Sequence, residues 1–314
     1  MTVTAKTTLN NMETTNTNPL LCDIESGICE IPDSSLALTE LKEAASRKPL
    51  KIIYFTDPIC SSCWGIEPQL RKLKLEYGEN FEIDYRMGGL LRDWTYNSGG
   101  ISKPSDVAHH WDQVSLHYDM PIDGDVWLED PLDSSYPPSI AFKAAQLQNE
   151  NTAIHFLRVL REMVFLKKIN IAKWENLAAA ANFVGLDPYR FQCDFNGIAN
   201  DLFEQDMQLG LQLGVRGFPT MFFVDSQGNT EKVYGTKPYS VYEDALLKQL
   251  PEASKREIDT DWKKLFTKYN TMTAREFAEL SKTPRKQAEQ MLHELVKSGN
   301  LSELPSKNGS LWKS

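Results

Sequence analysis

Two cysteines separated by two serines, Cys60-Ser61-Ser62-Cys63, are the residues of this sequence best suited to chemistry. Thiol–disulfide exchange needs two sulfurs that can close on each other, one of them as a reactive thiolate. The apolar run at residues 51–56 predicts a buried strand, and the residues after Cys60 have helical periodicity. Because a helix N-terminus lowers a cysteine pKa, we expect Cys60 to be the attacking nucleophile and Cys63 the resolving thiol.

The serines between the cysteines are expected to serve the thiolate. Ser61 and Ser62 offer hydroxyl and amide donors and are candidate substrate-binding positions. Two alternatives remain: a zinc half-site, or two inert helix cysteines. Zinc needs two further ligands, which Cys22 and Cys29 could supply, although seven positions is an unusual spacing for such a pair.

The chain holds five cysteines, so three lie outside this motif. Cys22 and Cys29 flank a short turn-like stretch with acidic neighbours, which weaken a thiol as a nucleophile. A reactive dithiol in the same chain could exchange with them, so we interpret them as an accessory redox pair; two reduced or structural cysteines are the alternative. Cys193 stands alone in an apolar helical context and is expected to be a buried packing residue.

Two prolines at unusual positions help to identify the fold around the cysteines. Pro68 lies inside the helix expected to run from the cysteines to Tyr77, where proline bends the axis. Pro219 lies at the entry to a strand, a place that proline normally avoids. Together with the Asp-Pro-Ile-Cys-Ser-Ser-Cys-Trp stretch at 57–64, these features resemble the thioredoxin superfamily. The resemblance covers roughly residues 50–250 and is strongest for the DsbA-like branch, in its FrnE-like or protein-disulfide-isomerase subgroup.

The resemblance implies roles for further residues. In that family the proline matching Pro219 is cis and packs against the active-site disulfide, and the backbone of its neighbour Phe218 would pair with an extended substrate segment. Glu67 matches an acidic position that manages protons, with a solvated surface carboxylate as the alternative. Trp64 is expected mainly to cover the site by packing and is also a candidate substrate contact.

The sequence departs from the pattern in two respects. DsbA itself is exported and often carries Pro-His between its cysteines, whereas Ser61 and Ser62 stand here, which puts a strongly oxidising role in doubt. The related glutathione-transferase-kappa and hydroxychromene-carboxylate isomerase enzymes use a single Ser or Cys with glutathione. Retention of both Cys60 and Cys63 argues against that chemistry.

The expected fold class is α/β: a thioredoxin fold with a long all-helical insertion. Strands are expected at 81–87, 220–224 and 230–234, a last helix at 239–249, and helices at 104–119, 139–149, 151–167, 172–184 and 195–213. The expected domains are a leader at 1–19, a DsbA-like domain at 20–250 with its insertion at about 100–213, a linker at 251–260 and a tail at 261–314.

The tail differs from the rest in charge. Residues 262–314 hold ten Lys or Arg and five Asp or Glu, so they carry +5, and the remainder carries −14 of the total −9. Two helices followed by a hairpin predict a small winged-helix-like module, with Arg285 and Lys286 at the start of its recognition helix. Such modules bind nucleic acid or protein, and both alternatives stay open.

Composition and net charge exclude several classes of protein. A chain of 314 residues with 41% hydrophobic residues is long and apolar enough to fold, and its net charge of −9 argues against an overall nucleic-acid or anionic-membrane surface. Its first 20 residues lack the apolar region of a secretory signal, so we expect a cytoplasmic protein with no membrane contact. No metal site or cofactor is predicted.

Two hypotheses follow. The leading one is an enzyme, a thiol–disulfide oxidoreductase or isomerase that forms a mixed disulfide between Cys60 and a protein or small-thiol substrate. The alternative is a non-catalytic thioredoxin-fold adaptor or redox-sensing regulator. It would be similar to the adaptor that delivers a transcription factor to the ClpXP protease, or would bind DNA through its tail. Trapped adducts on Cys60 would distinguish the first hypothesis from the second.

Overall fold

The computed structural model describes residues 22–23, 28–30, 48–95 and 102–314. The leader at 1–19 therefore lies outside the described residues, as do residues 31–47. Within the described part of the chain, no helix has the length and hydropathy of a membrane span.

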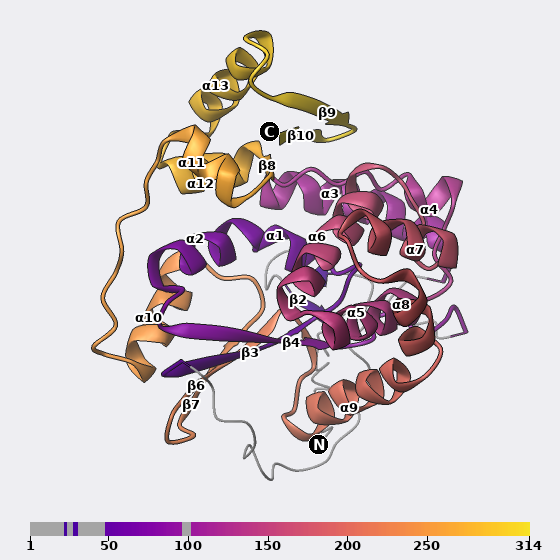
Figure 1. Ribbon diagram of the computed structural model, residues 1–314. Coiled ribbons are helices and arrows are strands. Elements are labelled where there is room, and N and C mark those ends of the chain that lie inside the picture. The colour runs from indigo at the N-terminus through magenta and orange to yellow at the C-terminus, as the bar shows by residue number, and fades with distance from the viewer. Residues whose placement is uncertain (1–21, 24–27, 31–47, 96–101) are drawn as a thin grey trace, which may run out of the picture.

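A four-stranded sheet forms the centre of the fold (Figure 1), in the order β4-β3-β6-β7. Its strands are β3 (Leu50–Thr56), β4 (Phe81–Met87), β6 (Thr220–Asp225) and β7 (Thr230–Tyr234). β3 runs parallel to β4 and antiparallel to β6, which pairs antiparallel with β7. β3 is buried along almost its whole length, which explains its continuous apolar sequence. The sheet and the helices around it confirm the expected fold class.

The helix after the cysteines is two helices. α1 (Ser61–Gly65) ends before Ile66, and α2 (Glu67–Tyr77) begins directly after it. Pro68 lies in the first turn of α2, where its missing N–H leaves no intrahelical bond unmade. The proline thus starts a new helix here, whereas the sequence predicted one bent helix. α10 (Tyr239–Gln249) has the predicted bounds and contacts α2.

The insertion between β4 and β5 (Gly217–Phe218) is helical, as predicted. Its helices are α3 (Pro104–Tyr118), α4 (Val126–Glu129), α5 (Tyr136–Gln148), α6 (Glu150–Leu166), α7 (Trp174–Phe183), α8 (Pro188–Phe195) and α9 (Ile198–Gln212). The short α4 has no counterpart among the predicted helices. α5 begins three residues earlier than expected because Pro137 and Pro138 fit within its first turn.

A second, small sheet contains segments far apart in the sequence. β1 (Cys22–Asp23) pairs antiparallel with β2 (Ile28–Glu30), and β2 pairs antiparallel with β5 (Gly217–Phe218). The antiparallel pairing of β1 with β2 agrees with the turn-like sequence between Cys22 and Cys29. The pairing of β2 with β5 was not expected.

The C-terminal module packs against the rest of the protein on the side of α2 and α3 (Figure 1). It consists of α11 (Trp262–Lys268), β8 (Thr271–Thr273), α12 (Ala274–Ser281), α13 (Arg285–Lys297), β9 (Ser302–Ser306) and β10 (Gly309–Lys313), with the sheet order β8-β10-β9. Phe277, Leu292 and Trp312 belong to its own hydrophobic core. The element order fits a winged-helix-like module, which stays a prediction.

The module's charge is matched by the surface on which it docks. Lys307 of the β9–β10 turn lies 2.7 Å from Asp112 and 2.6 Å from Asp125, and Arg285 lies 2.8 Å from Asp119. These three acids belong to the helical insertion or its loops. The charge asymmetry seen in the sequence therefore reflects, at least in part, two surfaces of one molecule that attract each other.

Candidate functional site

Cys60 and Cys63 meet at the turn between β3 and α1. Cys60 is the N-cap of α1, and its sulfur accepts a hydrogen bond from the backbone N–H of Cys63 at 3.1 Å. Both side chains have zero solvent-exposed area. The sequence thus located this junction correctly, but the thiols lie beneath the surface.

The electrostatics of the pair differ from the expectation that Cys60 is the thiolate. Burial raises the pKa of the Cys60 thiol well above its ordinary value, with further contributions from its hydrogen bond and charge interaction with Cys63. For Cys63, burial acts in the same upward direction, but the hydrogen bond from Cys60 and the charge of Arg161 outweigh it and lower its pKa. α1 has only five residues, so the helix dipole available to Cys60 is small.

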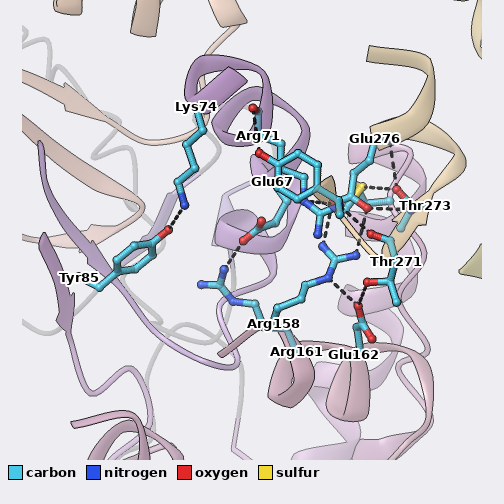
Figure 2. A network of polar contacts seen from close by, with 12 residues as sticks. Glu67, Arg71, Lys74, Tyr85, Arg158, Arg161, Glu162, Thr271, Thr273 and Glu276 are labelled. Carbon is cyan, nitrogen blue, oxygen red and sulfur yellow. Dashed lines mark hydrogen bonds and ion pairs between the residues drawn. The ribbon is translucent and has the colours of Figure 1, made fainter. Parts of the chain in front are cut away.

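Arg161 of α6 is the main polar residue of the site that the sequence argument missed. Its guanidinium lies 2.5 Å from Glu67 Oε1 (Figure 2). It also donates to Thr56 Oγ1 at 2.6 Å, and the side chain is 1% exposed. The carboxylate of Glu67 is therefore held in an ion pair, and its expected proton-transfer role stays untested. The sequence did contain a signal for this residue, since Arg161 lies in the mostly apolar run at 156–166. An arginine buried by such a run needs a charged or hydrogen-bonding partner.

Asp57 fixes the turn before Cys60. Its two carboxylate oxygens accept hydrogen bonds from the N–H of Ile59 at 3.0 Å, the N–H of Leu90 at 2.8 Å and the hydroxyl of Ser135 at 2.9 Å. Burial raises its pKa to about 6, although all three hydrogen bonds act in the opposite direction. Asp57 thereby ties the cysteine turn to the loop after β4 and to the start of α5.

Three candidate substrate positions are buried. Ser61 and Ser62 are 1% and 0% exposed, and the Ser62 hydroxyl lies 2.9 Å from the Tyr118 hydroxyl. Trp64 donates from Nε1 to the carbonyl of Pro121 at 3.0 Å and stacks on Phe165 with ring centroids 5.6 Å apart. Trp64 thus acts in packing, as expected, and none of the three presents a surface to a substrate.

The edge expected to receive a substrate strand is occupied by the chain itself. The Phe218–Pro219 peptide bond is cis, the conformation that the resemblance implied. Phe218 is fully buried, and its backbone pairs with Cys29 of β2. β2 also lies against α1, so it covers the region between the cysteine helix and β5.

The predictions for the other three cysteines differ in how they compare with the structure. Cys22 and Cys29 are directly opposite each other across β1 and β2. Cα atoms of such a pair lie about 4.5–5.5 Å apart, a separation that a disulfide can bridge, but their role stays a prediction. Cys193 is exposed, contrary to the expected packing role, because Phe191 marks the inward face of α8 and Cys193 lies two residues further round the helix. Among the described residues, no group of three or more metal ligands occurs.

The fold and the Cys60–Cys63 turn define a thioredoxin-fold protein of the DsbA-like kind. A family model described as thioredoxin matches residues 54–244. The cytosolic disulfide reductase DsbM from Pseudomonas aeruginosa superposes with a TM-score of 0.52 at 19% identity, over 63% of this chain and 98% of the reductase. At that identity the likeness supports the fold alone.

Two relatives resemble nearly the whole chain. The ClpXP adapter protein SpxH of Halalkalibacterium halodurans is 36% identical over 303 residues, which cover 94% of this chain and 97% of the relative. SpxH of Shouchella clausii is 33% identical over 296 residues, or 93% and 96% of the two chains. The chain belongs to the thioredoxin-fold family that contains these SpxH proteins.

These relatives overturn the leading functional hypothesis. The Cys-x-x-Cys motif and the family resemblance predicted an enzyme, a thiol–disulfide oxidoreductase or isomerase. Relatives that match 93–94% of this chain are named as ClpXP adapter proteins. The Cys-x-x-Cys motif predicted thiol–disulfide exchange because its spacing allows the two sulfurs to meet. Spacing does not show whether the sulfurs are accessible, and the fold buries both Cys60 and Cys63.

Proposed function

We propose that this protein is a cytoplasmic adaptor that binds a protein partner and presents it to a ClpXP-type protease. The supporting observation is the similarity to SpxH adapters, which extends over 94% of this chain and therefore reaches into the module after residue 260. In this proposal the thioredoxin fold is a binding scaffold, and recognition is non-covalent.

Two features of the site support a binding scaffold. The sulfurs of Cys60 and Cys63 are inaccessible, and the adjoining strand edge is paired with β2. The C-terminal module is fixed to the body through the buried Glu276, which Arg158 contacts through both carboxylate oxygens at 2.7 and 3.1 Å. Body and module can therefore present one continuous surface to a partner.

The nucleic-acid alternative gains less support. Arg285, expected at the start of a recognition helix, forms ion pairs with Asp119 and Glu289. Lys307, in the predicted wing, is held by two aspartates. Phosphate contacts by these two cations would need the existing pairs to break.

The proposal is tested by degradation with purified components. Proteins that accumulate both without this chain and without ClpX in the source organism are the candidate partners. We expect one of them to be degraded by purified ClpXP several-fold faster when this protein is added. A Cys60→Ser/Cys63→Ser variant should retain that acceleration, since recognition does not use the thiols. Degradation that is independent of this protein, or that is lost in the double variant, would overturn the proposal.

A further inference from the structure

A cavity of about 870 Å³ lies between the body and the C-terminal module. The body contributes residues of α2, β4, α6 and α7, and the module contributes the turn at 268–271 together with residues of β9 and β10. We call this space the interdomain cavity. Neither part of the chain would enclose it alone, so its shape depends on the docking of the module.

The interdomain cavity is basic in an otherwise acidic protein. Seven Lys or Arg residues line it against three glutamates, while the chain as a whole carries −9. Three of these cations, Lys167, Lys268 and Lys313, are exposed. Within the described ranges, no carboxylate lies within 4.0 Å of their ammonium groups. These lysines are available to an anionic partner.

The inner wall of the cavity carries the network in Figure 2. Two of the lining glutamates are already paired, Glu67 with Arg161 at 2.5 Å and Glu162 with Arg158 at 2.7 Å. The buried Nε of Arg161 has no hydrogen-bond partner in the described structure. The acids in the wall therefore do not neutralise the lysines at the rim, and one further donor remains inside.

Apolar side chains complete the lining. Phe183 at the end of α7 is 64% exposed and Leu304 of β9 is 36% exposed, and both line the cavity. One comes from the body and the other from the module. Large exposed apolar residues that share a concave site with charged groups are typical of protein docking sites.

We propose that the interdomain cavity binds an acidic, amphipathic segment of a protein partner, with an apolar anchor between Phe183 and Leu304 and carboxylates against Lys167, Lys268 and Lys313. This inference rests on the proposed adaptor function and assigns it a surface. A protein segment fits better than nucleic acid, because a polyanion would extend beyond the cavity over a body whose sequence carries −14.

The test is fluorescence polarisation with the full-length protein and a labelled peptide in which glutamates flank a Leu-Phe pair. A peptide with lysines in place of the glutamates is the charge control, and a single-stranded oligonucleotide tests the competing class of ligand. The variant is Lys268→Glu/Lys313→Glu. Its matched control is Lys264→Glu/Lys286→Glu, two exposed lysines of the same module that do not line the cavity. A Phe183→Ala variant tests the apolar anchor.

We expect the acidic peptide to bind and the lysine peptide to fail. The cavity charge reversals should weaken binding by about tenfold and the control pair by less than about twofold. Phe183→Ala should weaken it by about threefold or more. Equal binding of both peptides, tighter binding of the oligonucleotide, or equal effects of the two double variants would overturn the inference. If degradation by ClpXP still depends on this protein in that case, the adaptor function stands and only its surface is misassigned.

Discussion

The backbone of Cys29 pairs with that of Phe218, the residue before the cis Pro219, in an antiparallel ladder. The strand edge beside the cysteine helix is therefore occupied by a segment that lies almost 190 residues away in the sequence. Glu30 extends the same ladder opposite Gly217. This pairing closes the approach to Cys60 and Cys63 that an extended peptide would use.

Removal of residues 1–30 should expose the two thiols. In a background where Cys193 is replaced by Ser, the truncated protein carries only Cys60 and Cys63. We expect their labelling by a maleimide to become about tenfold faster than in a full-length Cys22→Ser/Cys29→Ser/Cys193→Ser protein, because local opening would no longer require β2 to leave β5. Labelling is measured by mass spectrometry over time. Equal rates in the two proteins would show that other elements shield the thiols.

Glu276 should contribute strongly to the docking of the C-terminal module. It is fully buried, contacts Arg158 and Arg71, and accepts the N–H of Thr273 at 2.7 Å. Burial opposes its ionisation, but the two arginines lower its pKa. Glu276→Gln removes the carboxylate that pairs with Arg71 and leaves Arg158 with Glu162 alone, so we expect the free energy of unfolding to fall by about 3–5 kcal/mol in urea denaturation.

Glu279 provides the matched control on the same helix. It pairs with Lys72 at 2.7 Å, and both side chains are 18% exposed. We expect Glu279→Gln to cost about 1 kcal/mol or less, because a partly solvated pair gains little over hydration. Similar losses in the two variants would mean that the buried cluster does not hold the module in place.

Arg161 should control the ionisation of Cys63. Its charge lowers the pKa of that thiol against the effect of burial, so Arg161→Met should raise it. The pKa is measured from thiolate absorbance in the ultraviolet during a pH titration, in a Cys22→Ser/Cys29→Ser/Cys60→Ser/Cys193→Ser background that leaves Cys63 as the only thiol. Arg92→Met, at a side chain that is 80% exposed, is the control. An unchanged or lowered pKa in Arg161→Met would contradict this electrostatic account.

The sequence predicted most of what local pattern determines. The strand at 81–87, the hairpin partner at 230–234 and the helix at 239–249 have their predicted bounds, because alternation and helical periodicity are strong there. The cysteine turn was also located correctly. Local pattern fails where a contact comes from far along the chain. Arg161 and Glu67 are 94 residues apart in the sequence, and no rule of local spacing predicts that they form an ion pair.

The function was misread for a related reason. Cys60 and Cys63 have the spacing of a redox pair in a sequence read without its fold. Their accessibility depends on the helical insertion and on β2, which both contact α1, and on Trp64 of α1, which is bonded to the insertion at Pro121. The exposed Cys193 shows the opposite error, since its apolar helical context was taken as a sign of burial. Burial is a collective property, and it decides whether a thiol is a reagent or part of the core.

Asp57 should make stability depend on pH in the direction opposite to that of a salt-bridged carboxylate. Its pKa is raised from 3.8 to about 6, so the folded state holds a proton that the unfolded state has lost between these two values. Stability from this group therefore falls as pH rises through that interval, by about 3 kcal/mol over the whole range and about 1 kcal/mol between pH 5 and pH 7.

The measurement compares wild type with Asp57→Asn by urea denaturation at several pH values from 5 to 7. Asparagine cannot ionise, and its amide cannot accept all the hydrogen bonds from Ile59, Leu90 and Ser135, so the variant should be less stable throughout. The difference between the two proteins should nevertheless shrink as pH rises, because only wild type bears the cost of a buried charge. A difference that is constant or grows with pH would show that Asp57 is already ionised at pH 5 in the folded protein.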